Sequence, residues 1–184
     1  STESVWANAR DDSSGTVSGT THTANSSFAA VARYGGRGGG NTYRIYRSFM
    51  WFDTSGITGT VSAATIKVHG YGTNDGSIIA VKSTAFGGDG GTALAAAALD
   101  AITGYSAGSL AGNATVYGPQ ILTSSWSTSG YNDFTGTSDL LADMQNNDAV
   151  IICFMDYTND YLNSAVGSNA FLNCGAYFTD NSGT

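Results

Sequence analysis

The residues of this 184-residue chain that could take part in chemistry are few and lie far apart in the sequence. Of the two histidines, His22 lies in a polar, Thr-rich loop and His69 on the polar side of an alternating segment. The sequence has no His-x-x-x-His metal pair and no G-x-S-x-G turn that would present a nucleophilic serine. Because catalysis needs acid, base or nucleophilic groups that converge on one point, we expect a protein that is not an enzyme.

Thirteen of the fourteen acidic residues are Asp, so two carboxylates at glycosidase spacing would arise easily by chance. A denser group is Asp156, Asn159 and Asp160, which follow an apolar strand within five residues. Their oxygens are the hard ligands that Ca²⁺ prefers. The same residue types also cap turns. We expect no obligatory cofactor, and these three residues either bind a structural calcium ion or cap a turn.

Four aromatic residues at predicted strand ends or loops are candidates for glycan binding: Trp126, Tyr131, Tyr157 and Tyr161. Aromatic rings stack on the apolar side of sugars, and neighbouring Asn and Asp side chains can hydrogen-bond sugar hydroxyls. The alternative is that these rings close one end of the core.

Two cysteines and one arginine are expected to be buried. Cys153 and Cys174 both lie in apolar alternations, so they either form a disulfide or remain two buried free thiols. Arg47 lies within the most apolar strand pattern, where a lone charge would be very costly. We therefore expect it to pair with a carboxylate such as Asp53 or Asp156.

The composition favours a β-rich protein outside the cell. Charged residues make up only 11%, the net charge is −7 and the sequence pI is about 4.3. An acidic surface without a basic stripe argues against nucleic acid and anionic membranes as partners. No apolar run approaches the roughly 18 residues of a membrane span. No secretion signal is visible, so we expect either that a signal was removed or that the protein leaves the cell by lysis.

Apolar alternation predicts strands throughout the chain. The expected strands cover residues 5–10, 28–33, 43–53, 64–68, 79–81, 149–157 and 171–178. The segment 43–53 is apolar on both sides around residues 49–52, which predicts a central, doubly covered strand. The Ala-rich segment 94–99 is either a turn of helix or an irregular crossover, and we favour the crossover because glycines lie close on both sides of it.

A short helix is predicted over 138–145, capped by Ser138, with Leu140, Leu141 and Met144 on one face. Many short strands with Gly-rich turns are typical of a sandwich. The fold class that we predict is an all-β, jelly-roll β-sandwich with this one short helix, formed as a single domain over 1–184.

Three groups of residues resemble a known group of modules. They are YRSFMWFDTSGI at 46–57 followed by VSAATIKV at 61–68, WSTSGYNDF at 126–134, and MDYTNDYL at 155–162 with a closing AYFTDNSGT at 176–184. Together they resemble DNRLRE-type and carbohydrate-binding-like jelly-roll modules, in the version found in virion proteins of tailed bacteriophages.

This resemblance implies a non-enzymatic virion surface protein that decorates the head or forms a fibre or adhesin module, with self-association or other virion proteins as partners and weak binding of a host glycan. The alternatives are a glycan-binding module of a secreted bacterial protein and a subunit of an extracellular filament. Similar modules continue into a further strand. We therefore expect either that the chain is part of a longer polypeptide or that a neighbouring subunit completes the sheet.

Overall fold

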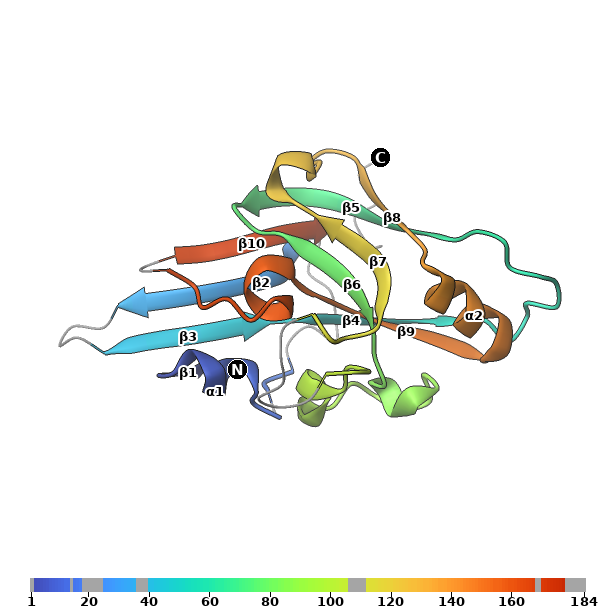
Figure 1. The fold of residues 1–184 in the computed structure, drawn as a ribbon, viewed down its shortest axis with the longest axis horizontal. Helices are drawn as coiled ribbons and strands as arrows, with labels where there is room; N and C mark the ends of the chain where they lie inside the picture. Colours follow the sequence, from blue (N-terminus) through green and yellow to red (C-terminus); the bar gives the residue numbers. More distant parts are fainter. Residues whose placement is uncertain are drawn as a thin grey trace.

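A computed structural model describes residues 2–13, 15–17, 25–35, 40–105, 112–167 and 170–177. Two antiparallel sheets pack against each other (Figure 1). The first sheet contains, in spatial order, β1 (Thr2–Glu3), β3 (Asn41–Tyr46), β2 (Asn25–Gly35), β10 (Ala170–Tyr177), β5 (Thr65–Asn74) and β8 (Tyr131–Thr135). The second contains β4 (Ser48–Asp53), β9 (Ala149–Asp156), β6 (Ile78–Lys82) and β7 (Val116–Ile121).

The strand order is that of a jelly roll. We number the strands along the chain from β2 and count β3 and β4 as one long strand. In this numbering the strand order is 1-8-3-6 in one sheet and 2-7-4-5 in the sheet that faces it. This double Greek-key order has eight strands and two facing sheets. The predicted all-β sandwich is therefore confirmed.

Apolar side chains from both inner faces pack against one another between the sheets. The ring of Phe154 on β9 lies 4.5 Å from that of Phe28 on β2 and 5.7 Å from that of Phe134 on β8. Gly118 on β7 has to be a glycine, because a Cβ there would lie 2.6 Å from the Cβ of Phe134. One ring thus links strands of both sheets into a close-packed core.

Short helical segments connect or cover the strands. They are α1 (Trp6–Arg10), η1 (Phe86–Gly88), η2 (Ala96–Asp100), η3 (Thr123–Ser125), α2 (Ser138–Asn146) and η4 (Tyr157–Tyr161), the last being a turn of π-helix. The helix predicted over 138–145 is confirmed as α2, but its N-cap is Thr137, whose hydroxyl accepts from the backbone N–H of Leu140. No helix among the described residues has the length and apolar character that crossing a bilayer requires.

The prediction of a strand over 5–10 is wrong, because most of this segment forms α1. Trp6 and Ala9 are three residues apart, so a helix buries both on one side, whereas a strand would separate them onto opposite faces. The segment 94–99 also differs from the expected irregular crossover, since η2 forms one 3₁₀ turn there.

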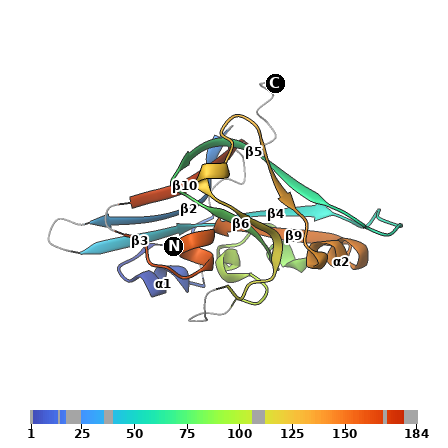
Figure 2. The same cartoon turned by 45° about the horizontal axis from the view of Figure 1, so that its top comes forward.

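The long strand predicted over 43–53 is two strands in different sheets. β3 pairs with β2, β4 pairs with β9, and the single residue between them is Arg47. Figure 2 shows β4 leaving the end of β3 toward the other half of the molecule. The expected double cover is also wrong, because β4 is an edge strand whose Trp51 and Phe52 are 45% and 46% exposed.

The two cysteines are free and buried, so the disulfide alternative is wrong. Cys153 lies on β9 of the second sheet and faces away from the space between the sheets, whereas Cys174 lies on β10 of the first sheet and faces into it. Burial raises the pKa of both thiols, that of Cys174 to about 12. Both are therefore protonated, apolar core residues.

Candidate functional site

Arg47, at the crossing from the first sheet to the second, is fully buried and uses its whole guanidinium group. Its Nε and Nη2 donate to the two carboxylate oxygens of Asp160, each at 2.7 Å. Its Nη1 donates to the carbonyl of Leu99 at 2.7 Å and to Asp100 at 3.1 Å. Nη2 also donates to the carbonyl of Arg10 at 3.2 Å. The prediction that Arg47 pairs with a carboxylate is confirmed, but the partner is Asp160 and not Asp53 or Asp156.

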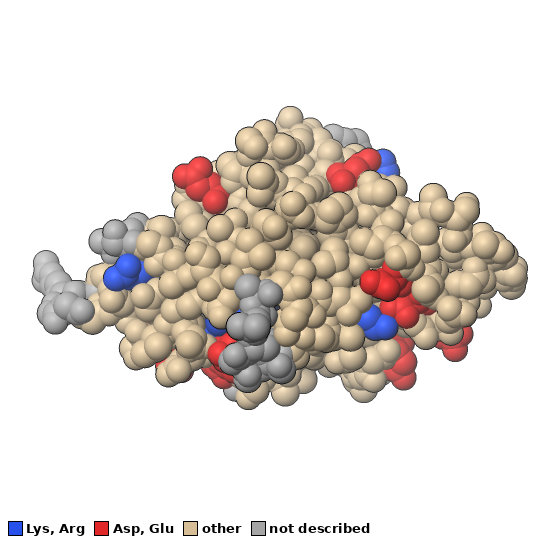
Figure 3. Space-filling view, viewed as in Figure 1, with Lys and Arg blue, Asp and Glu red and all other residues tan. Residues whose placement is uncertain are grey.

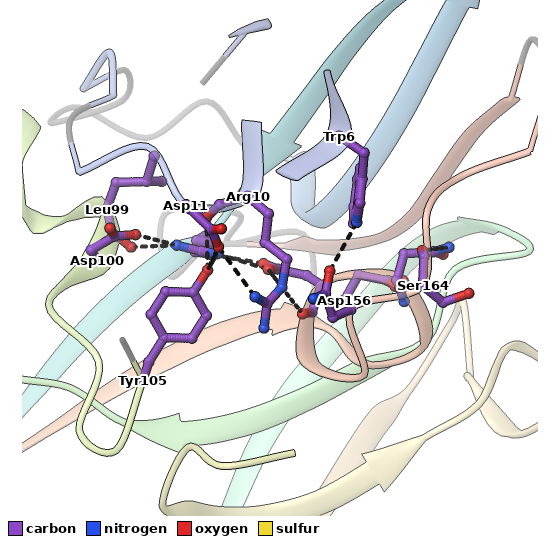
Figure 4. Close-up of polar contacts among 12 residues, drawn as sticks. Trp6, Arg10, Asp11, Leu99, Asp100, Tyr105, Asp156 and Ser164 are labelled. Atoms are coloured by element: carbon purple, nitrogen blue, oxygen red, sulfur yellow. Dashed lines mark hydrogen bonds and ion pairs between the residues drawn. The ribbon is translucent and has the colours of Figure 1, made fainter. Parts of the chain in front are cut away.

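A second arginine closes the same group of residues (Figure 4). The Nε of Arg10, on α1, donates to the backbone carbonyl of Asp160 at 2.7 Å. Both guanidinium groups lie over the ring of Tyr105, at 4.8 Å for Arg10 and 5.1 Å for Arg47. The hydroxyl of Tyr105 donates to the carbonyl of Arg10 at 2.8 Å. We call Arg10, Arg47, Asp100, Tyr105 and Asp160 the Arg47 cluster.

The charges of the Arg47 cluster balance one another inside the protein. Burial alone would lower the pKa of Arg47, but the Asp160 carboxylate outweighs burial and the net shift is upward. Burial raises the pKa of Tyr105 to about 12, so the phenol keeps its proton and donates it. Each carboxylate of the Arg47 cluster is paired with an arginine. Through these contacts η4, η2 and α1 are held at the crossing point of the sheets.

The three calcium candidates lie side by side, and most of their polar atoms bond to the protein, although the buried Oδ1 of Asn159 accepts no hydrogen bond within the described residues. Asp156 caps η4: its Oδ1 accepts from the backbone N–H of Asn159 at 2.7 Å, and its Oδ2 from that of Ser77 at 3.1 Å. The carboxylate of Asp160 accepts hydrogen bonds from Arg47. The side-chain amide of Asn159 donates to the carbonyl of Ser164 at 2.7 Å. The capping alternative therefore describes Asp156, whereas Asp160 is the ion-pair partner of Arg47. Within the described residues, no group of three or more His, Cys, Asp or Glu could hold a metal ion.

Asp156 is a buried carboxyl group whose hydrogen bonds within the described residues come from uncharged donors. Burial raises the pKa of Asp156 to about 6, because the hydrogen bonds from Asn159 and Ser77 only partly replace the lost hydration. Its side chain is 1% exposed.

The four aromatic glycan candidates do not form one cleft. Trp126 is only 6% exposed and belongs to the core between the sheets. Tyr157 and Tyr161 stack on each other at 5.7 Å and pack against the outer side of the second sheet. Tyr131 lies on the outer side of the first sheet and is 65% exposed. The alternative of aromatic residues closing the core thus holds for Trp126, and Tyr131 alone keeps the exposure that a stacking residue needs.

Tyr131 is part of a continuous group of rings on the outer face of the first sheet. His69 on β5 pairs with Tyr131 on β8, and their rings lie 5.1 Å apart. Tyr177 on β10 lies 5.4 Å from His69 and 5.1 Å from Tyr71. All three contacts are edge-to-face, with interplanar angles between 63° and 81°. We call Tyr131, His69, Tyr177 and Tyr71 the tyrosine row.

Sequence reasoning placed His69 on the outward face of its strand, which is confirmed, but missed Tyr71 and Tyr177. A signal was present, since Lys67, His69 and Tyr71 alternate with inward-facing residues on β5. Tyr177 comes from β10, and the pairing of β5 with β10, whose register shifts at Tyr71, brings the rings of Tyr71 and Tyr177 together, which a single-strand pattern does not show. His22 and residues 178–184 of the closing segment lie outside the described residues.

Comparisons with protein-family models, curated proteins and solved structures gave no match. The resemblance to phage-type jelly-roll modules therefore stays a prediction. What the chain can do has to be argued from the geometry of the tyrosine row and the Arg47 cluster.

The Arg47 cluster predicts a large loss of stability when its carboxylate is removed. Asp160→Asn removes the bidentate carboxylate and leaves the buried guanidinium of Arg47 with the partly exposed Asp100 as its counter-charge, so we expect the free energy of unfolding to fall by about 3–5 kcal/mol. Urea unfolding followed by circular dichroism measures the loss. The control is Asp133→Asn, which breaks the exposed pair with Lys67 and should cost at most about 1 kcal/mol. Equal losses in the two variants would contradict the assignment.

The raised pKa of Asp156 predicts a specific pH dependence. Between the ordinary carboxyl pKa and about 6, the folded protein binds a proton that the unfolded chain does not, so stability falls as pH rises through this window. From pH 7 to pH 5 we expect the wild type to gain about 1 kcal/mol relative to Asp156→Asn. Unfolding in urea at both pH values tests this, with Asp139→Asn reporting the loss of an exposed charge. A stability difference that is the same at both pH values would rule out the shift.

Proposed function

We propose that the chain is a non-enzymatic attachment module of an extracellular surface and that it binds glycans through the tyrosine row. The observation that carries the proposal is the set of four neighbouring rings on one sheet face, of which Tyr131 and Tyr71 are 65% and 47% exposed. Exposed aromatic rings offer apolar faces to sugar rings, and tyrosine adds a hydroxyl for hydrogen bonding. Soluble proteins seldom leave such rings grouped without a partner.

The setting that we propose is the surface of a tailed-bacteriophage virion, in head decoration, a fibre or an adhesin. Its support is the resemblance of the three segments given above. The jelly-roll order adds to it, because jelly rolls form both viral capsid and lectin domains, although a fold alone does not determine function. A glycan-binding module of a secreted bacterial protein would use the same face, and a subunit of an extracellular filament would use the sheet edge described below.

The polar groups of the described residues support a binding role rather than catalysis. Asp160 is paired with Arg47, Asp156 caps η4, and Asp143 accepts hydrogen bonds from Lys82 and Tyr117. His69 lies between the rings of Tyr131 and Tyr177, and within the described residues its ring contacts involve no carboxylate or nucleophile. Groups that already satisfy one another are poorly placed to react with a substrate.

The surface charge supports glycans over nucleic acid or anionic membranes as partners. The net charge is −7, and Figure 3 shows few charged groups among many neutral residues on the face that it displays. Negative charge repels phosphate-rich partners at long range but does not oppose a neutral glycan.

Other copies of this chain, or other virion proteins, are the protein partners that we propose. β4 is the edge strand of the second sheet, and in the described residues it pairs only with β9. It exposes Trp51 and Phe52, which are 45% and 46% accessible. Edge strands with exposed apolar side chains are templates for pairing with another chain.

Sedimentation velocity over a range of concentrations tests this contact. We expect the wild type to self-associate and the double variant Trp51→Ser, Phe52→Ser to shift toward monomer, because both exposed rings are removed. Leu122→Ser, at a residue 48% exposed on another edge, is the control and should associate like the wild type. A wild type that stays monomeric at high concentration would count against the contact.

Glycan binding is tested by retardation in native gels that contain hydroxyethylcellulose, galactomannan, alginate or polygalacturonate. We expect retardation by at least one polymer, and about tenfold weaker binding for Tyr131→Ala and Tyr71→Ala, as loss of a stacking ring removes about 1.4 kcal/mol. Tyr34→Ala is the matched control, because Tyr34 is 42% exposed but stacks on Arg44 outside the row. Loss of retardation in the Tyr34 variant but not in the row variants would contradict the proposed site.

A further inference from the structure

We infer that the tyrosine row binds an internal stretch of a linear, uncharged polysaccharide that is laid across the strands. This inference rests on the proposed glycan-binding function and names its ligand class. Its observations are the course of the row over the sheet, the unequal exposure of its rings, and the charges on the neighbouring rungs.

Three rings of the row, those of Tyr131, His69 and Tyr177, run across the strands, and Tyr71 lies beside this line on β5, two residues from His69. Tyr131 on β8 and His69 on β5 are direct partners in the ladder, and Tyr177 on β10 continues the line to a third strand. The steps between ring centres are 5.1 and 5.4 Å, close to the spacing of about 4.8 Å between neighbouring strands. A ligand that covers the row therefore has to extend over three strands, which is more than one hexose ring can do.

The exposure of the rings separates two stacking positions. Tyr131 on β8 and Tyr71 on the neighbouring β5 are the two most exposed rings, at 65% and 47%, whereas His69 beside Tyr131 and Tyr177 beside Tyr71 are half-buried. Tyr131 contacts His69 and Tyr71 contacts Tyr177, so a ligand that stacks on both exposed rings has to occupy two separate positions. A chain can do so, and its second contact then forms at high effective concentration, so binding strengthens with chain length.

The row lies on an open sheet face. β8 is the last strand of the first sheet, so Tyr131 stands at the margin of the face and a chain can run past it. Sites that select a chain end enclose it, whereas an open face accepts the interior of a chain. The geometry thus fits an internal stretch.

The charges next to the row favour an uncharged ligand. On the neighbouring rung Lys67 donates to Asp133 at 3.2 Å, and both side chains remain at least half exposed. The next rung pairs Thr65 with Thr135. The ion pair neutralises the lysine that an acidic sugar would need, while its exposed atoms and the threonine hydroxyls can hydrogen-bond sugar hydroxyls. A net charge of −7 also repels a polyanion.

The test uses calorimetric titration of the full chain with oligosaccharides of two to six units from cellulose and mannan, and with polygalacturonate fragments of equal length. We expect affinity for a neutral series to rise at least tenfold from the disaccharide to the hexasaccharide, and polygalacturonate to bind at least tenfold more weakly. In Tyr71→Ala the rise with length should flatten, because one of the two stacking positions is lost.

Asp133→Asn supplies a matched test of charge. Removing the carboxylate frees the Lys67 ammonium, so binding of the polygalacturonate hexasaccharide should increase severalfold, whereas Asp139→Asn, away from the row, should change it little.

The possible failures are distinguishable. If a neutral disaccharide binds as tightly as its hexasaccharide, or if polygalacturonate binds more tightly than both neutral series, the inference is overturned while the glycan-binding function stands. If none of the polymers or oligosaccharides binds, the proposed function fails and the inference fails with it.

Discussion

The structure depends on how one buried cation, Arg47, is satisfied. The long strand formed by β3 and β4 passes from one sheet to the other at this residue. The guanidinium of Arg47 donates hydrogen bonds to both carboxylate oxygens of Asp160. A buried ion pair adds little net stability over well-packed apolar residues, but removal of one partner is very costly. The pair therefore acts chiefly as a geometric constraint, because only one relative placement of the crossing, η4 and η2 satisfies all the donors of Arg47.

This constraint also explains which face of the sandwich is open. Two parts of the Arg47 cluster, η4 and Tyr105, lie against the outer side of the second sheet beside Cys153 and Met155, whereas α1 packs against β3 of the first sheet. The described part of the chain places no comparable cover on the outer side of the first sheet at β5 and β8. The tyrosine row is consequently left exposed on a rigid sheet, which is how a preformed binding surface is built.

The fold could be predicted from the sequence to a large extent, because strands with one buried face alternate visibly. The strands at 28–33, 64–68, 79–81, 149–157 and 171–178 correspond to β2, β5, β6, β9 and β10. The division of 43–53 was missed since no Gly or Pro marks it, and the partner of Arg47 is 113 residues away in the chain. Local sequence patterns do not show which carboxylate lies beside Arg47 in the fold, so they could not separate Asp160 from Asp53 or Asp156.

The candidate site was predicted less well than the fold. Tyr131 was identified because it begins a strand, but Trp126 only five residues earlier is a core residue, and local sequence does not separate the two. Tyr71 and Tyr177 join the row through the pairing of β5 with β10 and its irregular register. Rings from three strands become neighbours only when the sheet forms, so the group is a property of the tertiary fold.

The most direct test of the account is to map, by amide chemical shifts in NMR, where a neutral hexasaccharide of cellulose or mannan contacts the folded chain. The account predicts that the largest shifts cluster on β5 from Thr65 to Tyr71 and on β8 from Tyr131 to Thr135, with little change on β9 and η4. Shifts concentrated at β9 and η4, or spread evenly over the chain, would contradict it.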